Sequence, residues 1–395
     1  MSDLEKQDLK NKKVIVRVDL NVPLDDNDNV TDTTRIVACK DTVDLILEKG
    51  GTCILISHLG RPKGKENNFS LKKIVDTVSS VLNQPVFFYE DCIGQGAQEA
   101  ISKLDQGSII LMENLRFYQE ETLGDRVFAK NLSELGDIYV NDAFGTCHRE
   151  HASTAVIAEY FKNKKFAGKL LQKELEAISQ IANNGKKPVL AILGGAKVSS
   201  KLSILYNLIK NVDKIIIGGG MAYTFIKAKG GQIGNSLVED KLITNAQEIL
   251  MLAQKLDKKI ILPVDTKASK DFDNNNQISS FNSKEIEDGW MGLDIGEKSM
   301  EIFHQEILTS NTIFWNGPMG VFEKELFSEG TSSICNSLRE AKEKGINVII
   351  GGGDSIAALK KLGKEEWVGY ISTGGGALLE SLEGKTLPGV KALMQ

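Results

Sequence analysis

Short runs rich in β-branched and aromatic residues recur along the chain, and segments with helical spacing separate them. Examples are KVIVRVDLNVP and SIILMENLRF in the first half, and PVLAILGG and TIFWNGPMG in the second. Between two of the later runs, over residues 197–210, Val198, Leu202, Leu205 and Leu208 trace one apolar stripe with the spacing of a helix. This alternation predicts parallel, doubly wound sheets, so we expect an α/β fold with Rossmann-like domains.

The length predicts more than one domain, because 395 residues exceed the size at which a single hydrophobic core usually stops growing. The stretch GKLLQKELEAISQIANNG keeps helical spacing until its last residues, two Asn and a Gly. We therefore predict an N-terminal domain at 1–168, an interdomain helix at 169–185 and a C-terminal domain at 186–372. A tail at 373–395 is too short to form another lobe, and we expect it to pack back on the N-terminal domain.

Composition narrows the possible functions. The net charge of −5 argues against a nucleic-acid surface, which needs clustered basic residues. The five cysteines form no CxxC pair, which favours reduced thiols over disulfides or structural zinc. No apolar run approaches the length of a membrane span and no signal peptide is evident, so we expect a soluble cytoplasmic protein without nucleic-acid or membrane partners.

Arginine is concentrated in the first half of the chain. Of seven arginines among 48 basic residues, six precede residue 150. Five of the six flank strand-like runs or polar turns: Arg17, Arg35, Arg61, Arg116 and Arg149. A guanidinium can hold carboxylate or phosphate oxygens two at a time, which an ammonium cannot. The clustering predicts an anion site; structural salt bridges would explain the scarcity of arginine but not its clustering.

Glycine clusters follow the strand-like runs of the second half, at 194–195, 218–220, 351–353 and 374–376. Glycine lets the backbone approach a phosphate or an adenine closely, and a following helix N-terminus offers free N–H groups. This half therefore predicts a nucleotide site. No Walker A loop or GxGxxG motif is complete, since Leu379 stands where a Walker A loop needs its first glycine.

Two lysines and one aspartate accompany these glycines. Lys197 and Lys201 lie four residues apart, and on the first turns of the predicted helix they would share one face, where a polyphosphate would offset their repulsion. A pair of solvated surface lysines is the alternative. Asp354 precedes a predicted helix over 355–362, so its ordinary role would be an N-cap, but a carboxylate in a phosphate site can also hold Mg²⁺.

Nine segments of the chain, read in order, resemble the phosphoglycerate kinase family, and the resemblance runs from about Val16 to Leu393. They are VRVDLNVP, SHLGRPKG, ENLRF, NDAFGTCHREH, GGAKVSSK, WNGPMGVFE, GGGDS, STGGGA and LEGKTLPGV. The resemblance implies a cradle for 3-phosphoglycerate, with His148 and His151 nearby, made of Asp19, Leu20, Asn21, Arg35, His58, Leu59, Gly60, Arg61, Arg116 and Arg149. It implies nucleotide contacts at Gly195, Lys197, Lys201, Gly219, Gly292, Leu293, Asn316, Glu323, Gly352, Gly353, Asp354 and Ser355, with Asp354 toward Mg²⁺. Catalytic roles are implied for Arg35, Lys197, Lys201, Gly353 and Gly375. Leu378 and Ser200 depart from the pattern of many relatives. Because of Leu378, the resemblance does not predict which contacts the C-terminal tail makes.

The implied activity is the reversible, Mg²⁺-dependent transfer of a phosphoryl group between 1,3-bisphosphoglycerate with ADP and 3-phosphoglycerate with ATP. The acceptor carboxylate is already ionised, so the reaction needs positioning and positive charge rather than a general base. We expect direct transfer in a monomer, after the two domains close. The alternatives are a two-lobed anion-binding protein, a kinase of another small carboxylate, and a NAD-dependent dehydrogenase, which the absence of GxGxxG disfavours.

Overall fold

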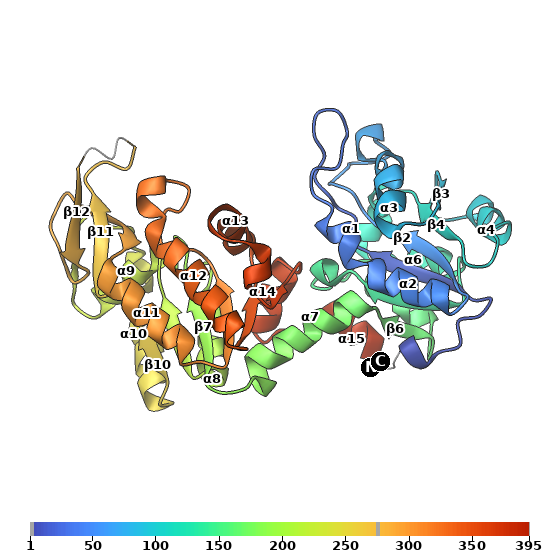
Figure 1. The fold of residues 1–395 in the computed structure, drawn as a ribbon. Helices are drawn as coiled ribbons and strands as arrows, with labels where there is room; N and C mark the ends of the chain where they lie inside the picture. Colours follow the sequence, from blue (N-terminus) through green and yellow to red (C-terminus); the bar gives the residue numbers. More distant parts are fainter. Residues whose placement is uncertain (1–3, 274–276, 395) are drawn as a thin grey trace. The chain divides into compact units, whose positions relative to one another are not determined.

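The structure is a computed structural model, and it describes residues 4–273 and 277–394. The chain forms two compact units (Figure 1): an N-terminal unit made of Met1–Leu175 and Thr386–Gln395, and a C-terminal unit made of Glu176–Lys385. Each unit is built on a parallel six-stranded sheet, which confirms the predicted α/β fold with two doubly wound domains.

The sheet of the N-terminal unit has the strand order β3-β4-β2-β1-β5-β6, and all of its strand pairs are parallel. Its strands are β1 (Lys13–Val18), β2 (Thr52–Ile56), β3 (Val86–Tyr89), β4 (Ile109–Met112), β5 (Ile138–Asp142) and β6 (Lys165–Ala167). Every residue of β2, β4 and β5 is buried, as continuous apolar runs in parallel sheets predict.

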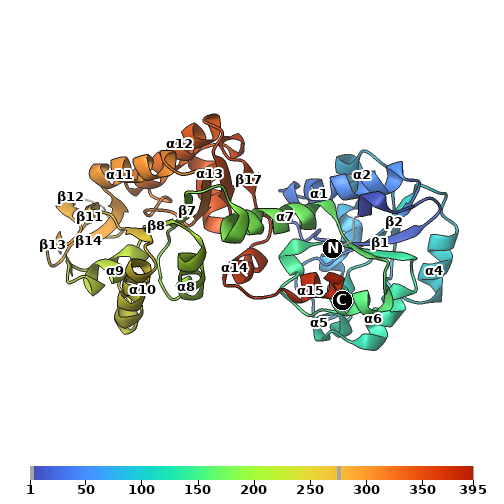
Figure 2. The same ribbon diagram turned by 90° about the horizontal axis from the view of Figure 1, so that it is seen from below.

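Helices cover both faces of this sheet. They are α1 (Thr34–Ala38), α2 (Lys40–Glu48), α3 (Val75–Leu82), α4 (Gln95–Ser102), α5 (Gln119–Leu123), α6 (Arg126–Ser133) and α15 (Pro388–Met394). Figure 2 shows α1 and α2 on one face and α5, α6 and α15 on the other. One hydrophobic core contains alternate residues of β1 together with Ile36 of α1 and Val43 of α2. The residues of β1 are Val14, Val16 and Val18.

The C-terminal unit repeats this plan with the strand order β10-β8-β7-β15-β16-β17, again with parallel pairs. The strands are β7 (Val189–Leu193), β8 (Lys214–Ile217), β10 (Lys259–Ile261), β15 (Thr312–Asn316), β16 (Asn347–Ile350) and β17 (Tyr370–Ile371). Two small sheets add β9 (Gln232–Ile233), β11 (Asp265–Ser269), β12 (Ile278–Asn282), β13 (Glu285–Ile286) and β14 (Met291–Ile295).

Its helices again form two layers. They are α8 (Leu202–Asn211), α9 (Met221–Ala228), α10 (Ile243–Lys255), α11 (Glu297–Leu308), α12 (Glu329–Glu343), α13 (Gly353–Leu362) and α14 (Gly376–Leu382). In Figure 2, α11 to α13 lie on one face of the sheet and α8 to α10 on the other. Trp315 of β15 and Phe303 of α11, both fully buried, lie in the core beneath α11 to α13.

The boundaries differ from the predicted ones. Helix α7 (Lys169–Ser179) and the π-helical turn Gln180–Asn184 occupy the predicted interdomain segment, but the division between the units falls inside α7, between Leu175 and Glu176. The predicted tail is also divided. Helix α14 packs on α8 of the C-terminal unit, where Asn207 donates to the carbonyl of Leu382, and only residues from Thr386 onward belong to the N-terminal unit.

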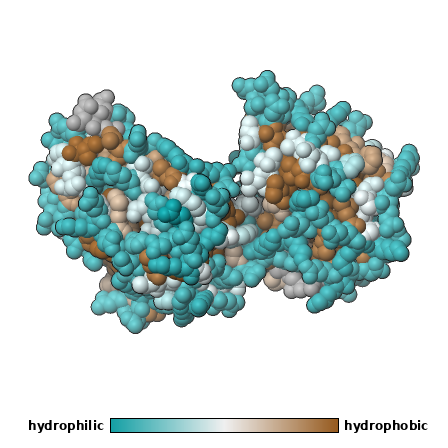
Figure 3. All heavy atoms as spheres, viewed as in Figure 1, coloured by the Kyte–Doolittle hydropathy of each residue, from teal (hydrophilic) through white to brown (hydrophobic). Residues whose placement is uncertain are grey.

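The surface is largely polar. Figure 3 shows one face of each unit, covered mostly by hydrophilic residues with smaller apolar areas between them. No helix in the described part of the chain is both long and apolar enough to cross a membrane. All five cysteines are buried free thiols.

Candidate active site

In both units the chain changes direction beside the first strand of the sheet. From β1 the chain goes to β2 on one side, and β5 later joins β1 on the other side. In the same way β7 is followed by β8 on one side and is later joined by β15 on the other. Ligands of open α/β sheets bind beyond the carboxyl ends of the strands at such switch points. The residues predicted for the two sites follow these strands.

In the N-terminal unit, Arg35 is anchored to the loop that follows β1. Its Nη1 donates to Oδ1 of Asp19 at 3.1 Å and to the carbonyl of Asn21 at 2.9 Å. The side chain of Arg35 remains 37% exposed. Asn21 in turn accepts a hydrogen bond from the backbone of Gly60 at 2.8 Å. The loops after β1 and β2 thus hold this guanidinium beside open solvent.

Arg116 is fixed from the next loops. Its Nη1 donates to the carbonyl of Gly60 at 2.7 Å, and its backbone N–H donates to the side chain of Asn114 at 3.0 Å. The amide of Asn114 also donates to the carbonyl of Leu59 at 2.8 Å. Arg116 and Arg35 are therefore linked through the same loop after β2.

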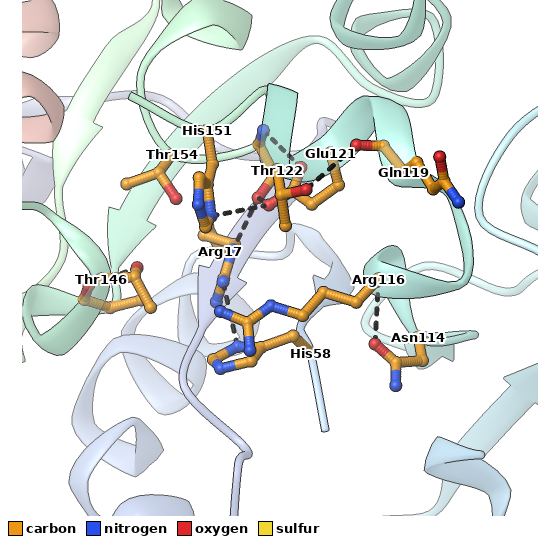
Figure 4. A network of polar contacts seen from close by, with 12 residues as sticks. Arg17, His58, Asn114, Arg116, Gln119, Glu121, Thr122, Thr146, His151 and Thr154 are labelled. Carbon is orange, nitrogen blue, oxygen red and sulfur yellow. Dashed lines mark hydrogen bonds and ion pairs between the residues drawn. The ribbon is translucent and has the colours of Figure 1, made fainter. Parts of the chain in front are cut away.

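A buried polar network lies beneath these loops (Figure 4). Arg17 of β1 is 1% exposed, and its Nε donates to Ser153 at 2.9 Å. The hydroxyl of Ser153 donates to Glu121 at 2.6 Å, and Glu121 also accepts from the backbone of Ser153. Nη2 of Arg17 lies 3.2 Å from Nδ1 of His58. The carboxylate of Glu121 offsets part of the charge that Arg17 brings into the interior.

The loop after β5 brings further cations. His151 is buried, and its Nδ1 lies 3.8 Å from Oε1 of Glu121, beyond hydrogen-bond distance. The neighbouring Arg149 is exposed. Both line a pocket of about 510 Å³ that His148 and Arg126 also border.

The pKa values show that the arginines act on one another. The pKa of Arg116 is lowered to about 10, mainly by burial and then by the charges of Arg17, Arg149 and Arg61, while the charge of Glu121 opposes this shift. The pKa of His58 lies well below its ordinary value, mainly because the ring is buried and then because of the charges of Arg17, Arg116 and Arg35. Three guanidinium charges therefore act on the neutral His58, and the charges of Arg149 and Arg61 reach Arg116, an arrangement that an anion would stabilise.

Two residues of the predicted cradle turn away from this space. Leu20 and Leu59 are buried, at 0% and 3% exposure, so only their backbones can face a ligand. His58 is also buried, and its lowered pKa keeps it neutral, so it adds no positive charge to the cradle. Arg61 is exposed, and Gly60 adopts a φ of 63° with Phe69 packed against it.

In the C-terminal unit, most glycines at the strand ends contact other backbone. A Cβ on Gly219 would lie 2.7 Å from the backbone of Gly195, and one on Gly194 would overlap the carbonyl of Pro318. A Cβ on Gly292 would overlap the hydroxyl of Tyr223. Gly195 itself has open space on its outer side, as do Gly353 and Gly375. Among these glycines, Gly195, Gly353 and Gly375 leave room for a ligand to approach closely.

The two lysines differ in environment, and neither lies on the first turns of a helix as predicted. Helix α8 begins at Leu202, because residues 197–201 form a turn in which Lys201 donates its N–H to the carbonyl of Val198. Lys197 is exposed. The ammonium of Lys201 donates to the carbonyls of Gly194 at 2.6 Å and Asn316 at 2.7 Å. Burial lowers its pKa to about 8, and the charge of Asp354 opposes this shift.

Asp354 does not cap its helix. Helix α13 begins one residue earlier, at Gly353, with Gly352 in the N-cap position at a φ of 91°, so Asp354 lies exposed in the first turn. The buried hydroxyl of Ser355 accepts from the backbone of Gly317 at 2.5 Å and so ties α13 to the loop after β15. Within residues 4–273 and 277–394, no three His, Cys, Asp or Glu side chains group to hold a metal ion.

Comparison with known proteins identifies the family of the chain. The sequence profile described as phosphoglycerate kinase matches residues 3–385. Phosphoglycerate kinase 1, chloroplastic, of Arabidopsis thaliana is 49% identical over 395 residues, which are 100% of this chain and 82% of that protein. Phosphoglycerate kinase of Porphyromonas gingivalis is 46% identical, with 99% of each chain covered. The structure of phosphoglycerate kinase from Coxiella burnetii matches with a TM-score of 0.91 at 38% identity, covering 99% of this chain and 98% of that one.

The chain belongs to the phosphoglycerate kinase family. It is therefore a phosphotransferase whose acceptor is a carboxyl group, and the resemblance inferred from the motifs is confirmed. An anion-binding protein without turnover and a dehydrogenase are not favoured. A more distant structure, phosphoglycerate kinase from Pyrococcus horikoshii OT3, still matches with a TM-score of 0.81 at 30% identity over 100% of this chain and 98% of that one.

The remaining predicted residues of this phosphoglycerate kinase fold lie around the same strand ends. Asn316 is the last residue of β15, is 4% exposed and donates to the carbonyl of Gly351 at 2.6 Å. Glu323 is exposed, and its carbonyl accepts from Lys361 of α13 at 2.9 Å. Leu378, whose effect the sequence left open, is fully buried in α14 and packs against Gly351.

Sequence reasoning missed three residues beside the sites. Glu121 belongs to the buried network of Arg17. Leu237 is 41% exposed and lies beside Gly220 and Ala196, next to the glycine turns. Glu239 accepts a hydrogen bond from the backbone of Ser199 in the lysine loop. The signal that could have found Leu237 is an apolar residue between polar ones, in the segment NSLVED.

Proposed function

We propose that this chain moves a phosphoryl group between the carboxyl group of 3-phosphoglycerate and ADP, in both directions, within glycolysis. The N-terminal unit binds phosphoglycerate and the C-terminal unit binds the nucleotide. The observation that supports this most is the grouping of five arginines in the N-terminal unit: Arg17, Arg35 and Arg116 act on the buried His58, and Arg61 and Arg149 act on Arg116. A ligand with a carboxylate and a phosphate matches several guanidinium forks at once.

The chain contributes charge and position rather than a proton acceptor. The acceptor carboxylate is ionised, and the buried His58 and His151 have lowered pKa values, to about 4 for His151, because burial and the surrounding arginines disfavour their protonation. Arg35, anchored on one side by Asp19 and Asn21, faces the transferring phosphoryl group. Arg61, Arg116 and Arg149 hold the substrate's own phosphate and carboxylate.

The nucleotide is held by backbone and by few side chains. The open sides of Gly195, Gly353 and Gly375 and the N-terminus of α13 take the phosphates. The ammonium group of Lys201 exchanges its hydrogen bonds to the carbonyls of Gly194 and Asn316 for bonds to phosphate oxygens. Lys197 acts on the transferring phosphoryl group. The exposed side chain of Leu237 provides an apolar surface for the base, and Glu323 binds a ribose hydroxyl. Leu293 is 7% exposed, so only its backbone can face the nucleotide.

The residues also fit a magnesium ion that enters with the nucleotide. Mg²⁺ in nucleotide sites is commonly held by one or two carboxylates together with substrate phosphates, rather than by an all-protein cage. Asp354 is an exposed carboxylate in the first turn of α13, near enough to Lys201 for its charge to raise that lysine's pKa. When bound, the ion neutralises charge on the phosphates, and Asp354 positions it.

Acceptor and nucleotide residues belong to different units, so transfer requires the two units to approach during the reaction cycle. We propose a closing motion in a monomeric cytoplasmic enzyme. Scattering with each substrate alone and with both together measures this, and an unchanged radius of gyration with both substrates would contradict closure.

A coupled assay tests the proposed function directly. ATP is offered with 3-phosphoglycerate and, separately, with glycerate and with other small carboxylates. We expect turnover with 3-phosphoglycerate far above that with glycerate, because Arg61, Arg116 and Arg149 have no phosphate to bind in the latter. Equal turnover with a different carboxylate would reassign the acceptor.

A further inference from the structure

The loop that carries both lysines is held by a side chain from another segment. The backbone N–H of Ser199 donates to Oε2 of Glu239 at 2.9 Å. Burial raises the pKa of Glu239, but hydrogen bonds from Ser199 and Val198 and the charge of Lys197 outweigh this effect and keep the pKa below its ordinary value. Glu239 is therefore an ionised group bound to residues 198–199 at neutral pH.

Glu239 is itself fixed from the other side. Its backbone N–H donates to Oγ1 of Thr224 at 3.2 Å, and Thr224 is 1% exposed on α9. Two residues earlier, Leu237 lies against Gly220, close to Ala196. The segment 237–239 thus connects the buried helix α9 to the lysine loop.

Lys197 depends on this support more than Lys201 does. Lys201 has two backbone carbonyls of its own, at the ends of β7 and β15. Lys197 is exposed and precedes the first residue of α8 by five positions. The next residue, Val198, is buried, and the carbonyl of Lys197 accepts from the hydroxyl of Ser200 at 2.8 Å within the same turn. The contact that ties this turn to a distant segment is the bond from Ser199 to Glu239.

We propose that Glu239 is a positioning residue for Lys197: it holds residues 197–199 where the lysine reaches the transferring phosphoryl group. This inference rests on the proposed function of the lysine loop. Glu239 touches neither substrate, and it acts through the loop alone.

The proposal predicts a large effect on kcat and little effect on the KM for ATP. Without Glu239 the loop is loose, so kcat falls because Lys197 is misplaced in the transition state. The same change removes a negative charge beside Lys197, so the KM for ATP does not rise. General damage to the nucleotide site would instead raise this KM and lower the midpoint of urea unfolding.

The experiment compares Glu239→Ala, Glu239→Gln and a matched control, Asp240→Ala. Glu239→Ala lowers kcat by about 10- to 100-fold with the KM for ATP within twofold of wild type. Glu239→Gln keeps an acceptor oxygen and recovers most of kcat. Asp240 is the next residue, exposed and paired with Lys227 at 2.8 Å, and its loss leaves the kinetics unchanged.

A double-mutant cycle with Lys197→Ala identifies the route of the effect. If Glu239 acts through Lys197, adding Glu239→Ala to Lys197→Ala lowers kcat no further. Full additivity, or a folded Glu239→Ala with kcat within twofold of wild type, overturns the proposal. If the alanine variant does not fold, Glu239→Asp, shorter by one methylene, is judged by the same criteria. If wild type fails to phosphorylate 3-phosphoglycerate, the proposed function is wrong; if only the Glu239 variants match wild type, the positioning role alone is wrong.

Discussion

The two units present positive charge in different ways. The N-terminal unit uses guanidinium groups, braced by carboxylates such as Asp19 and by the buried Arg17, Ser153 and Glu121 network. The C-terminal unit uses backbone turns and two lysines, one of which is held by carbonyls. A small ligand with fixed carboxylate and phosphate groups suits planar forks, whereas a flexible polyphosphate suits N–H groups and mobile ammonium groups. The difference therefore follows from the shapes of the two substrates.

The largest expected effect is at Arg35. Arg35→Lys keeps the charge but removes the planar fork, so only one of the contacts to Asp19, Asn21 and the transferring group can be kept. We expect kcat to fall by roughly 10²- to 10³-fold, as when a transition-state hydrogen-bond donor is lost, with the KM for ATP little changed. Steady-state kinetics measures both constants.

Arg126→Lys is the matched control. Arg126 lies in the same unit and borders the pocket of Arg149 and His151, but its side chain is 73% exposed and pairs with Glu159 at 2.8 Å instead of contacting the loop after β1. Its activity should equal that of wild type. Near-normal turnover of a folded Arg35→Lys would show that the N-terminal site needs charge and not fork geometry, and the contrast between the units would disappear.

The second prediction separates the two lysines of the C-terminal unit. Lys197→Ala should lower kcat by roughly 10- to 100-fold with little change in the KM for ATP, since an exposed lysine is free to act on the transferring group. Lys201→Ala should also raise the KM for ATP. Equal, small effects of both changes would mean that the lysines are solvated surface residues and that backbone alone holds the nucleotide.

The sequence predicts those features of the two units that depend on local sequence patterns. Strand-like runs and the turns after them predicted where both candidate sites lie, because the carboxyl ends of parallel strands collect on one edge of the sheet. The start of α8 was predicted too early, because Ser199 bonds to Glu239, which lies 40 positions away. For Asp354 the sequence favoured a role toward Mg²⁺ over an N-cap, and the N-cap position is indeed occupied by Gly352, with a φ of 91°.

Non-local contacts explain the other differences. The glycine clusters were expected to let backbone approach a nucleotide, and the structure gives Gly194, Gly218 and Gly219 a further role: they make room for residues 317–319, which approach through the pairing of β15 with β7. Glu121 shows no signal of its own in the sequence, and its role depends on Ser153, 32 residues later. Local patterns predict where a chain turns but not which distant segment will lie beside the turn.

The third prediction uses the lowered pKa of Lys201. Burial brings this pKa to about 8 in the folded protein, so the free enzyme loses the lysine's charge as the pH rises through 8. Because bound phosphate favours the charged form, the KM for ATP should rise above pH 8, by up to about tenfold per pH unit. Kinetics at constant ionic strength from pH 7 to 9.5 measures this.

Lys201→Arg is the control, since a guanidinium stays charged over the whole range. Whatever the value of its KM for ATP at pH 7, this KM should not rise with pH. A flat KM in wild type up to pH 9.5 would show that Lys201 takes no part in binding phosphate. The N-terminal site, built of arginines, should show no such dependence for 3-phosphoglycerate.

The smallest expected effect concerns His151, where the arginines of the N-terminal unit act on a titrating group. Burial, then Arg116, Arg17 and Arg149, lower the pKa of His151 to about 4. The unfolded chain binds this proton near pH 6.5, so stability is lost as the pH falls from about 6.5 to about 4, on the order of 2 kcal/mol by pH 5. An anion in the cradle offsets the arginine charges and should raise the pKa of His151. Imidazole NMR titration with and without 3-phosphoglycerate measures this shift, with His151→Gln assigning the signal and His304 of the other unit as an internal reference. If His151 titrates near 6.5 in the free protein, the arginines do not act on it as described, and the electrostatic difference between the two units is smaller than the structure indicates.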